Sequence, residues 1–310
     1  MRIISIDKPK GWTSFDVVIF LKKYFQEKKV GHLGTLDPIA TGVLPVFMGK
    51  ATRLIPYFNN DDKTYRAVFK LGESSDTYDA EGLITKINHS TRLNDDKVTK
   101  ALNSFLGEQK QTIPPYSAAK INGIPYYKLA RKGIRVPKKF HNVIFHELII
   151  EKIELPYIKF IVKCSKGTYI RSLANDLGIS LKVGAHLTSL ERLACGKFFN
   201  TNNTITINEL KNIDDFTKIP WISPLVLLND IYSINASDEM LSSIKFGRRV
   251  ELSPSNSYPE ADTLDSNELI KQQINRLQTK VLDINQNLIA IGHLLWDNKQ
   301  CYFQPSKVFI

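Results

Sequence analysis

The sequence predicts a mixed α/β (α+β) protein in which a large domain is followed by a small β-rich one. Segments of helical and strand periodicity are mixed over residues 1–230, whereas residues 231–310 consist mainly of short strand-like runs. A length of 310 residues fits this division. With 43% hydrophobic and 24% charged residues, the composition is that of a globular protein, which excludes a wholly disordered chain and a disulfide scaffold.

The amino-terminal residues predict a strand, a turn and a helix. Residues 3–6 form a short apolar run that ends in the turn-like residues 7–11. Thr13 and Asp16 have the spacing of a helix capping box. The apolar residues that follow at helical spacing are Val17, Val18, Leu21, Tyr24 and Phe25.

The next segments predict a loop, a strand and a second helix. Residues 31–49 contain four glycines and two prolines, which favours an ordered loop leading into a short apolar strand. Residues 65–71 alternate as a half-buried strand does, and a polar loop follows over residues 72–82. Asn94 is placed to cap a helix that stops at Gly107.

The second half of the chain predicts further strands and two helices. Two adjacent strands are expected at residues 147–154 and 157–164, followed by a helix over residues 168–177. Residues 281–284 and 288–291 predict strands of the small domain. A helix that runs up to the first of these strands is predicted by the spacing of Ile270, Ile274, Leu277 and Val281.

The charge balance predicts a polyanionic partner. Lysine and arginine number 42 against 31 acidic residues, a net charge of +11; a basic protein without such a partner is the alternative. Three cysteines without a C-x-x-C pair support neither a disulfide framework nor a cysteine zinc site. The amino terminus is charged too early for a signal peptide and no apolar stretch approaches ~18 residues, so we expect a cytosolic protein without membrane contact.

The positive charge is concentrated in residues 114–146. The seven formal charges of this segment are all positive: Lys120, Lys128, Arg131, Lys132, Arg135, Lys138 and Lys139. Four aromatic residues are interleaved with them: Tyr116, Tyr126, Tyr127 and Phe140. Cations neutralise phosphates and tyrosines stack on bases, so the segment predicts contact with nucleic acid; the alternative is a solvated basic hairpin.

A single carboxylate, Asp37, lies among the glycines and prolines of residues 31–45. Because Pro38 follows it, the backbone of Asp37 is extended and its side chain is presented by a rigid turn. Such a loop also lets a large ligand approach its backbone. An ordinary Asp-Pro turn is the alternative reading.

Two other kinds of site fit the sequence poorly. Residues 49–52 resemble the end of a phosphate-binding loop, but Leu44 stands where its first glycine is needed and Ala51 follows Lys50. The six histidines show no H-E-x-x-H or paired-ligand spacing, so we expect no metal site.

Six motifs in order over residues 7–195 resemble the tRNA pseudouridine synthase B family. They are Lys8-Pro9-x-Gly11-x-Thr13-Ser14, Gly31-His32-x-Gly34-Thr35-Leu36-Asp37-Pro38-x-Ala40-Thr41-Gly42, Lys63-x-Tyr65-Arg66, Ser75-Asp76-Thr77-x-Asp79-Ala80-x-Gly82, Tyr116-Ser117-Ala118-x-Lys120 and Cys164-Ser165-Lys166-Gly167-Thr168-Tyr169-Ile170-Arg171. The combination is specific, although no single motif would be.

The resemblance implies a cofactor-free isomerisation of the uridine at position 55 in the T loop of tRNA to pseudouridine. It also implies a large, mostly antiparallel sheet carrying the active-site cleft, and a carboxy-terminal domain of the PUA-like, RNA-binding kind. That second likeness is loose and rests on residues 244–250. The target base must be flipped out of the folded loop, which costs a few kcal/mol.

The resemblance also assigns roles to individual residues. Asp37 matches the catalytic aspartate, which either attacks C1′ or removes the C2′ proton, and Arg171 matches its basic partner. Tyr65 matches the aromatic residue that stacks on the flipped uracil and assists proton removal from C5. The matching substrate-binding residues are His32, which takes the place vacated by the base, together with Tyr169 and Leu190 in the uracil pocket. The basic segment matches the family's RNA-gripping thumb, with Lys120, Lys128, Arg131, Lys132 and Arg135 as RNA-binding residues.

Two other functions stay open on the sequence. A guide-dependent relative that modifies ribosomal RNA within a multiprotein particle shares much of the Asp37 loop, but the intact basic segment favours a protein that acts alone, as a monomer on the T arm of tRNA without a guide RNA. A non-catalytic RNA chaperone would also explain the charge of +11.

Overall fold

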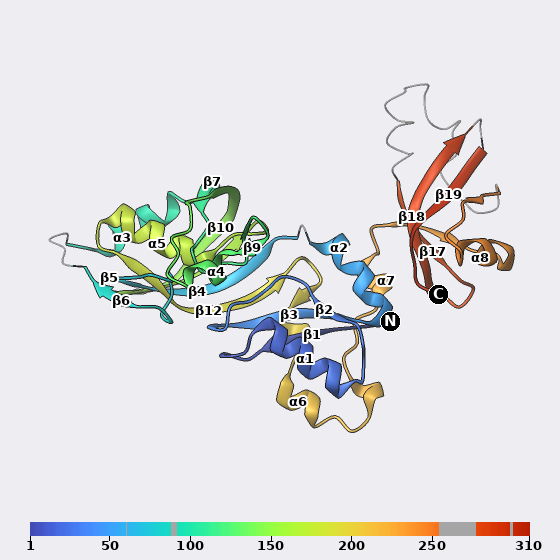
Figure 1. The fold of residues 1–310 in the computed structure, drawn as a ribbon, viewed down its shortest axis with the longest axis horizontal. Coiled ribbons are helices and arrows are strands. Elements are labelled where there is room, and N and C mark those ends of the chain that lie inside the picture. Colours follow the sequence, from blue (N-terminus) through green and yellow to red (C-terminus); the bar gives the residue numbers. More distant parts are fainter. Residues whose placement is uncertain (60, 88–91, 254–276, 298–299) are drawn as a thin grey trace. The chain divides into compact units, whose positions relative to one another are not determined.

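The computed structural model describes residues 1–310 except 60, 88–91, 254–276 and 298–299. The chain divides into two compact units. One unit comprises Ile4–Phe47 and Leu54–Pro220, and the other comprises Met1–Ile3, Met48–Arg53 and Trp221–Ile310. Each unit is built on a sheet of its own (Figure 1). The boundary expected at residue 230, between the large domain and the small carboxy-terminal one, stays a prediction.

The first unit contains a ten-stranded mixed sheet. Its main path runs β14 (Thr204–Thr206), β1 (Arg2–Lys8), β3 (Ala40–Met48), β12 (Ala185–Cys195), β4 (Lys63–Leu71), β11 (Tyr157–Cys164), β10 (Phe140–Glu154) and β7 (Gly107–Thr112). The strands β2 (Val30–His32) and β13 (Phe199–Asn200) pair with β3 and β12. All pairs from β12 to β7 are antiparallel, whereas β3 with β12 and β1 with β14 are parallel. The predicted mostly antiparallel sheet is confirmed.

Short elements complete this unit. The helices are α1 (Ser14–Tyr24), α2 (Ile55–Phe58), α3 (Asp95–Asn103), α4 (Tyr126–Ala130), α5 (Ile170–Leu181) and α6 (Ile207–Lys211), with 3-10 turns at Thr201–Asn203 and Phe216–Lys218. Two small hairpins pair β5 (Glu73–Ser75) with β6 (Ile84–Lys86), and β8 (Lys120–Ile121) with β9 (Ile124–Pro125).

Local capping decides where two helices begin. The predicted capping box is present at α1, where the backbone N–H of Thr13 donates to Asp16 Oδ2 at 2.7 Å and the N–H of Asp16 donates to Thr13 Oγ1 at 3.0 Å. The predicted cap of α3 is present as well, since Asn94 Oδ1 accepts from the N–H of Lys97 at 3.0 Å. Side-chain oxygens at these positions satisfy N–H groups that have no partner within the helix.

The core of this unit lies between the sheet and helix α5. Leu173 and Leu177 of α5 are buried, as are Phe69 of β4 and Phe160 of β11, whose rings meet edge to face at 4.8 Å. Alternate residues of β4 are buried as the sequence predicts. The sheet and α5 therefore form a rigid base for the loops at their ends.

Several boundaries differ from the predictions. The helix expected to stop at Gly107 ends at Asn103, and the polar loop expected over residues 72–82 contains the short strand β5. The loop expected over residues 31–49 is shorter, because the strand β3 already begins at Ala40. The strand expected at residues 147–154 begins at Phe140, since residues 140–145 pair with β7. The helix expected over residues 168–177 begins at Ile170 and continues to Leu181.

The second unit has a five-stranded sheet. Its order is β15 (Tyr232–Asn235), β17 (Gln278–Leu282), β18 (Leu288–Asp297), β19 (Gln300–Val308) and β16 (Val250–Glu251), with helices α7 (Pro224–Leu227) and α8 (Asp238–Ile244) and a 3-10 turn at Gly49–Leu54. The helix predicted up to Val281 is wrong over residues 278–281, which pair with β15 and β18; Ile270 and Ile274 lie outside the described residues. No helix in the described part of the chain is long and apolar enough to cross a membrane.

The packing of α5 on β12 predicts the effect of Gly178→Ala. Alanine is the better helix former by about 1 kcal/mol, but a Cβ at Gly178 would overlap the backbone of Gly184 and Ala185. Overpacking costs about 1–3 kcal/mol, so we expect the variant to be less stable in urea unfolding. Ser180→Ala, at an exposed position of the same helix, is the control and should change stability by less than about 0.5 kcal/mol. A stabilised Gly178→Ala protein would contradict the packing.

Candidate active site

The loop that carries Asp37 is fixed by the amino-terminal motif. Ser14, the first residue of α1, accepts from the backbone N–H of Leu36 at 2.8 Å and lies 3.2 Å from its carbonyl oxygen. The N–H of Gly11 donates to the carbonyl of Pro38 at 2.8 Å. The backbone on both sides of Asp37 is therefore held from outside the loop.

Asp37 forms an ion pair with Arg171. The Nε atom of Arg171 lies 2.9 Å from Oδ2 of Asp37, and the side chain of Arg171 is only 5% exposed while that of Asp37 is 36% exposed. Arg171 lies in the first turn of α5, on the rigid base described above. The structure thus brings the two predicted residues into direct contact and leaves the carboxylate accessible.

Arg171 is shared between two carboxylates. Its Nη1 atom lies 3.4 Å from Oδ2 of Asp79, whose side chain is 5% exposed. Asp79 is itself fixed through Oδ1, which accepts from Thr77 Oγ1 at 2.6 Å and from the N–H of Glu81 at 3.0 Å. The sequence motif of residues 75–82 contains Asp79, but without its spatial partner nothing in the sequence assigned it a role.

Backbone carbonyls complete the surroundings of Arg171. Its Nη1 donates to the carbonyl of Thr77 at 3.3 Å and its Nη2 to the carbonyl of Tyr116 at 3.2 Å. Tyr116 lies at the start of the basic segment. One buried side chain therefore links the Asp37 loop, the Asp79 loop and the base of that segment.

The surroundings of Asp37 raise the pKa of its carboxyl overall, although they contain effects of both signs. Burial raises the pKa of this carboxyl above its usual value, and the charge of Arg171 opposes that rise. Asp79 adds to the rise, and Lys8 opposes it. The two cations thus support the ionised form that both candidate chemical routes require.

Lys8 is a second buried cation beside the loop. Its side chain is fully buried, and Nζ donates to the carbonyls of Pro9 at 2.9 Å and Trp12 at 2.6 Å. Burial lowers the pKa of Lys8 to about 8, although the charge of Asp37 opposes this change. Sequence reasoning placed Lys8 in a turn and missed its burial.

Tyr65 and His32 are both uncharged near neutral pH. Tyr65 of β4 is 8% exposed, and burial raises its pKa to about 12. Burial, with a contribution from the charge of Arg192, lowers the pKa of His32 at the end of β2. Arg192 of β12 pairs with Tyr65 across the sheet, and its charge opposes the rise in the pKa of Tyr65. A neutral phenol and a neutral imidazole are suited to stacking and hydrogen bonding with a base.

Tyr169 and Leu190 are held by neighbouring strands. Gln111 of β7 binds the backbone of Tyr169 twice, accepting from its N–H at 2.8 Å and donating to its carbonyl at 3.0 Å. Leu190 is 6% exposed and pairs with Ala40 on one side and Ala67 on the other. Both neighbours of Leu190 in the sheet are therefore small residues.

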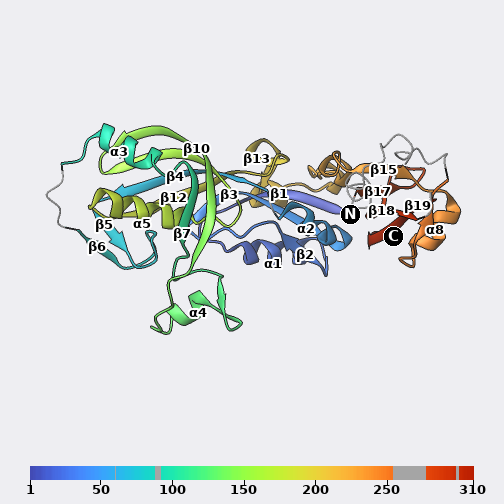
Figure 2. The ribbon, with the colours of Figure 1, turned by 90° about the horizontal axis from the view of Figure 1, so that it is seen from above.

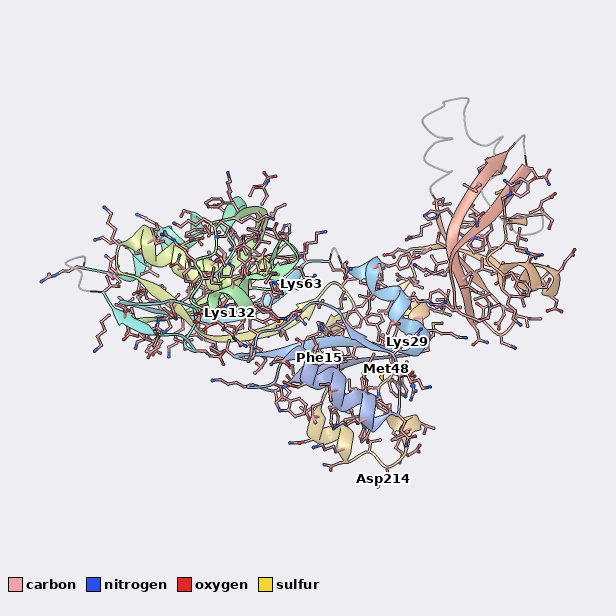
Figure 3. The ribbon with its side chains drawn as sticks, viewed as in Figure 1. Phe15, Lys29, Met48, Lys63, Lys132 and Asp214 are labelled. Carbon is pink, nitrogen blue, oxygen red and sulfur yellow. The ribbon has the colours of Figure 1, made fainter. Side chains whose placement is uncertain are left out.

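The predicted thumb residues lie around α4, on a segment that stands away from the sheet (Figure 2). They are Lys120, Lys128, Arg131, Lys132 and Arg135, all of them exposed; Lys132 is labelled in Figure 3 together with Lys63 of β4. None of the five forms an ion pair with another residue in the described part of the chain. The N–H of Ile113 donates to the carbonyl of Lys139 at 2.9 Å and closes the base of the segment.

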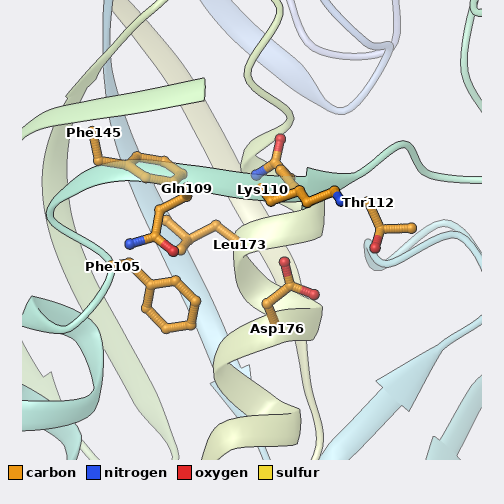
Figure 4. Close-up of a pocket in the computed structure, with 8 residues that line it drawn as sticks. Phe105, Gln109, Lys110, Thr112, Phe145, Leu173 and Asp176 are labelled. Carbon is orange, nitrogen blue, oxygen red and sulfur yellow. The ribbon is translucent and has the colours of Figure 1, made fainter. Parts of the chain in front are cut away.

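A separate cavity of about 230 Å³ lies between β7, β10 and α5 (Figure 4). Phe105, Gln109, Phe145, Leu173 and Asp176 are among its lining residues, and none of the predicted site residues lines it. Burial raises the pKa of Asp176. The cavity is distinct from the Asp37 site.

Comparison with known protein families shows which family this chain belongs to. A model described as TruB family pseudouridylate synthase (N terminal domain) matches residues 22–170, and one described as tRNA pseudouridylate synthase B C-terminal domain matches residues 171–218. The chain belongs to the TruB family. Asp37 and Tyr65 lie in the first match, and Arg171 and Leu190 in the second.

Individual TruB relatives are similar over most of the chain. A tRNA pseudouridine synthase B of Clostridium novyi is 48% identical over 219 residues, which cover 69% of this chain and 74% of the relative. A tRNA pseudouridine synthase B of Geobacter sulfurreducens is 39% identical over 246 residues, 79% of this chain and 81% of the relative.

Solved structures with a similar fold include an RNA–protein particle and a protein complex. An H/ACA RNP bound to a substrate RNA containing 2'-deoxyuridine has a TM-score of 0.68 at 22% identity, and a Cbf5-Nop10-Gar1 complex has a TM-score of 0.69 at 24% identity. Each match covers 100% of this chain and 85% of the other chain. The likeness confirms the pseudouridine synthase fold.

The buried Lys8 predicts a pH dependence of stability. With a pKa of about 8 in the native protein and 10.5 in the unfolded chain, the unfolded chain binds more protons between these values. The contribution of Lys8 to the free energy of unfolding therefore rises with pH through that window and is lowest below pH 8. The free energy of unfolding of wild type, relative to that of Lys8→Met, should therefore increase by roughly 3 kcal/mol from pH 8 to 10.5. Urea unfolding of both proteins across this range measures it. Parallel pH profiles for the two proteins would contradict this.

Proposed function

We propose that the protein is a tRNA pseudouridine synthase that isomerises the uridine at position 55 of the T loop. We further propose that it acts in the cytoplasm as a monomer, without metal, cofactor or guide RNA. The observation that supports this best is the accessible Asp37 carboxylate, ion-paired at 2.9 Å to the buried Arg171, within a TruB-family chain.

In the proposed reaction the N1–C1′ bond breaks and a C5–C1′ bond forms. The Asp37 carboxylate starts it by attacking C1′ or by removing the C2′ proton, and both routes begin from the ionised form. The detached uracil turns in the pocket and C5 bonds to C1′, which releases Asp37 from C1′ in the first route and returns the proton to C2′ in the second. C5 then loses its proton and N1 gains one. Tyr65 stacks on the uracil, while Tyr169 and Leu190 line the pocket and His32 takes the place vacated by the flipped base.

Binding of the RNA supplies the free energy for base flipping. Removing a base from the T loop costs a few kcal/mol of stacking and pairing. The exposed cations of the thumb segment form no ion pair within the described part of the chain, so they are available to phosphates and release counterions on binding. We therefore assign the grip on the T arm to Lys120, Lys128, Arg131, Lys132 and Arg135.

A guide-dependent rRNA pseudouridine synthase is the second candidate, because of the fold shared with the H/ACA RNP structure. The exposed basic segment favours action without a guide. A non-catalytic RNA chaperone is the third candidate; it would bind tRNA with an idle Asp37 loop.

Activity of the purified protein tests the proposal. We expect the protein alone, with EDTA and no nucleotide, to form a single pseudouridine in the T loop of an unmodified tRNA transcript, mapped chemically. Asp37→Asn should bind tRNA as tightly as wild type and lose at least roughly 1,000-fold in rate, because the amide is neither nucleophile nor base. Asp96→Asn, at an exposed position of α3, is the matched control and should keep full activity.

The outcomes separate the first candidate from the other two. Tight tRNA binding by wild type without product would favour a missing guide or a chaperone. Full activity of Asp37→Asn would refute the assigned chemistry while leaving the enzyme class intact.

The thumb assignment predicts a change in salt dependence. Replacing Lys128, Arg131 and Lys132 together by alanine should weaken tRNA binding and make the slope of log Kd against log salt shallower by up to roughly 3, if each contacts a phosphate. The control is Lys152→Ala with Lys159→Ala, because these lysines already pair with Glu154 and Glu151 at 2.6 and 3.3 Å. Equal slopes for the triple variant and wild type would contradict the assignment of these three residues to phosphate contact.

A further inference from the structure

Arg192 is a fully buried arginine that the proposed chemistry does not use. It lies on β12 with 1% exposure. Its Nε donates to the carbonyl of Val43 at 2.6 Å and its Nη2 to the carbonyl of Gly34 at 3.0 Å. No ion pair of Arg192 with a carboxylate occurs among the residues that the structure describes. A buried guanidinium without a carboxylate depends on such hydrogen bonds.

Two glycines of the Asp37 motif make room for Arg192. Gly42 pairs with Arg192 across the parallel β3–β12 ladder at a φ of +97°, and a Cβ there would overlap the Arg192 backbone. Gly34 has a φ of +77°, and a Cβ there would lie 3.2 Å from Nη1 of Arg192. The sequence alone predicts that such glycines let a ligand approach the backbone. At these two positions the group that approaches is an arginine of the protein itself.

Arg192 is also the direct cross-strand neighbour of Tyr65. The two residues lie opposite each other in the antiparallel β12–β4 ladder, so their side chains share one face of the sheet. The charge of Arg192 opposes the rise in the pKa of the phenol. One side chain therefore binds the carbonyls that flank Asp37 and lies beside the aromatic residue expected to stack on the base.

We propose that Arg192 is a positioning residue that holds Asp37 and Tyr65 in the mutual geometry required for isomerisation. This inference rests on the proposed function. Loss of the guanidinium would leave the Gly34 and Val43 carbonyls unpaired in the protein interior, so the loop between them would shift. A displacement of about 1 Å at reacting groups costs on the order of 100-fold in rate. The exposed thumb residues would be unaffected, so RNA affinity should be retained.

The test compares Arg192→Met and Arg192→Lys with wild type under single turnover on a tRNA transcript. We expect the rate constant of Arg192→Met to fall on the order of 100-fold, with a Kd for tRNA that changes by less than about 3-fold. Arg192→Lys keeps the charge but cannot reach both carbonyl oxygens, so roughly a tenfold loss is expected. Arg53→Met is the control, because Arg53 also donates to a carbonyl, that of Val308, in the other unit.

A folding defect gives a different signature. It lowers the fraction of active enzyme, and so the amplitude of the single turnover, whereas a positioning defect lowers its rate constant. If Arg192→Met fails to melt cooperatively, Arg192→Lys decides. A folded variant with the wild-type rate constant would overturn the proposal.

A measurement without substrate separates this inference from the proposed function. Tyrosine labelled with 13C at Cζ gives one resonance for Tyr65, assigned by its loss in Tyr65→Phe. That resonance should shift in both Arg192 variants and stay unchanged in Arg53→Met. An unchanged resonance would refute the Arg192–Tyr65 contact even if wild type proved active. A wild-type protein without activity on tRNA would refute the proposed function instead.

Discussion

One buried cation, Arg171, connects the parts of the candidate active site. Its guanidinium contacts Asp37, Asp79 and two backbone carbonyls, which belong to three separate loops. A guanidinium removed from water is stable only while its acceptors stay in place, and removing one partner of a buried pair costs about 3–5 kcal/mol. None of the three loops can therefore move without leaving unpaired charge. The Asp37 carboxylate, which we propose to be catalytic, is oriented before any RNA arrives.

The loop around Asp37 has little regular structure of its own, so its shape depends on contacts from elsewhere. Ser14 holds Leu36, and Gly11 holds Pro38, from the turn and helix at the amino terminus. Arg192 holds the flanks of the loop from β12. The amino-terminal motif and the Asp37 motif therefore act together, because the first supplies the hydrogen-bonding partners that hold the backbone of the second. The loop is a rigid part of the site whose rigidity comes from three distant segments.

The sequence predicted elements governed by local interactions and failed where distant partners decide. The alternation of residues 65–71 and the cap at Thr13 are local, and the structure contains both. Leu277 and Val281 are four residues apart, a spacing shared by one helix face and one strand face; pairing of residues 278–282 with β15 and β18 selects the strand. Lys8, Asp79 and Arg192 could not be assigned roles, because burial and charge partners depend on the folded chain.

The cations of the protein divide into two groups with different physical tasks. Lys8, Arg171 and Arg192 are buried, and their donors are directed at carbonyl or carboxylate oxygens of the protein itself. They release few counterions when RNA binds, because they are already removed from solvent. The exposed thumb cations keep their counterions until a phosphate replaces them. The salt dependence of Kd should therefore report on the exposed cations that bind the RNA. The rate constant at saturating RNA should report on the buried cations that position the site. The two groups can therefore be studied separately.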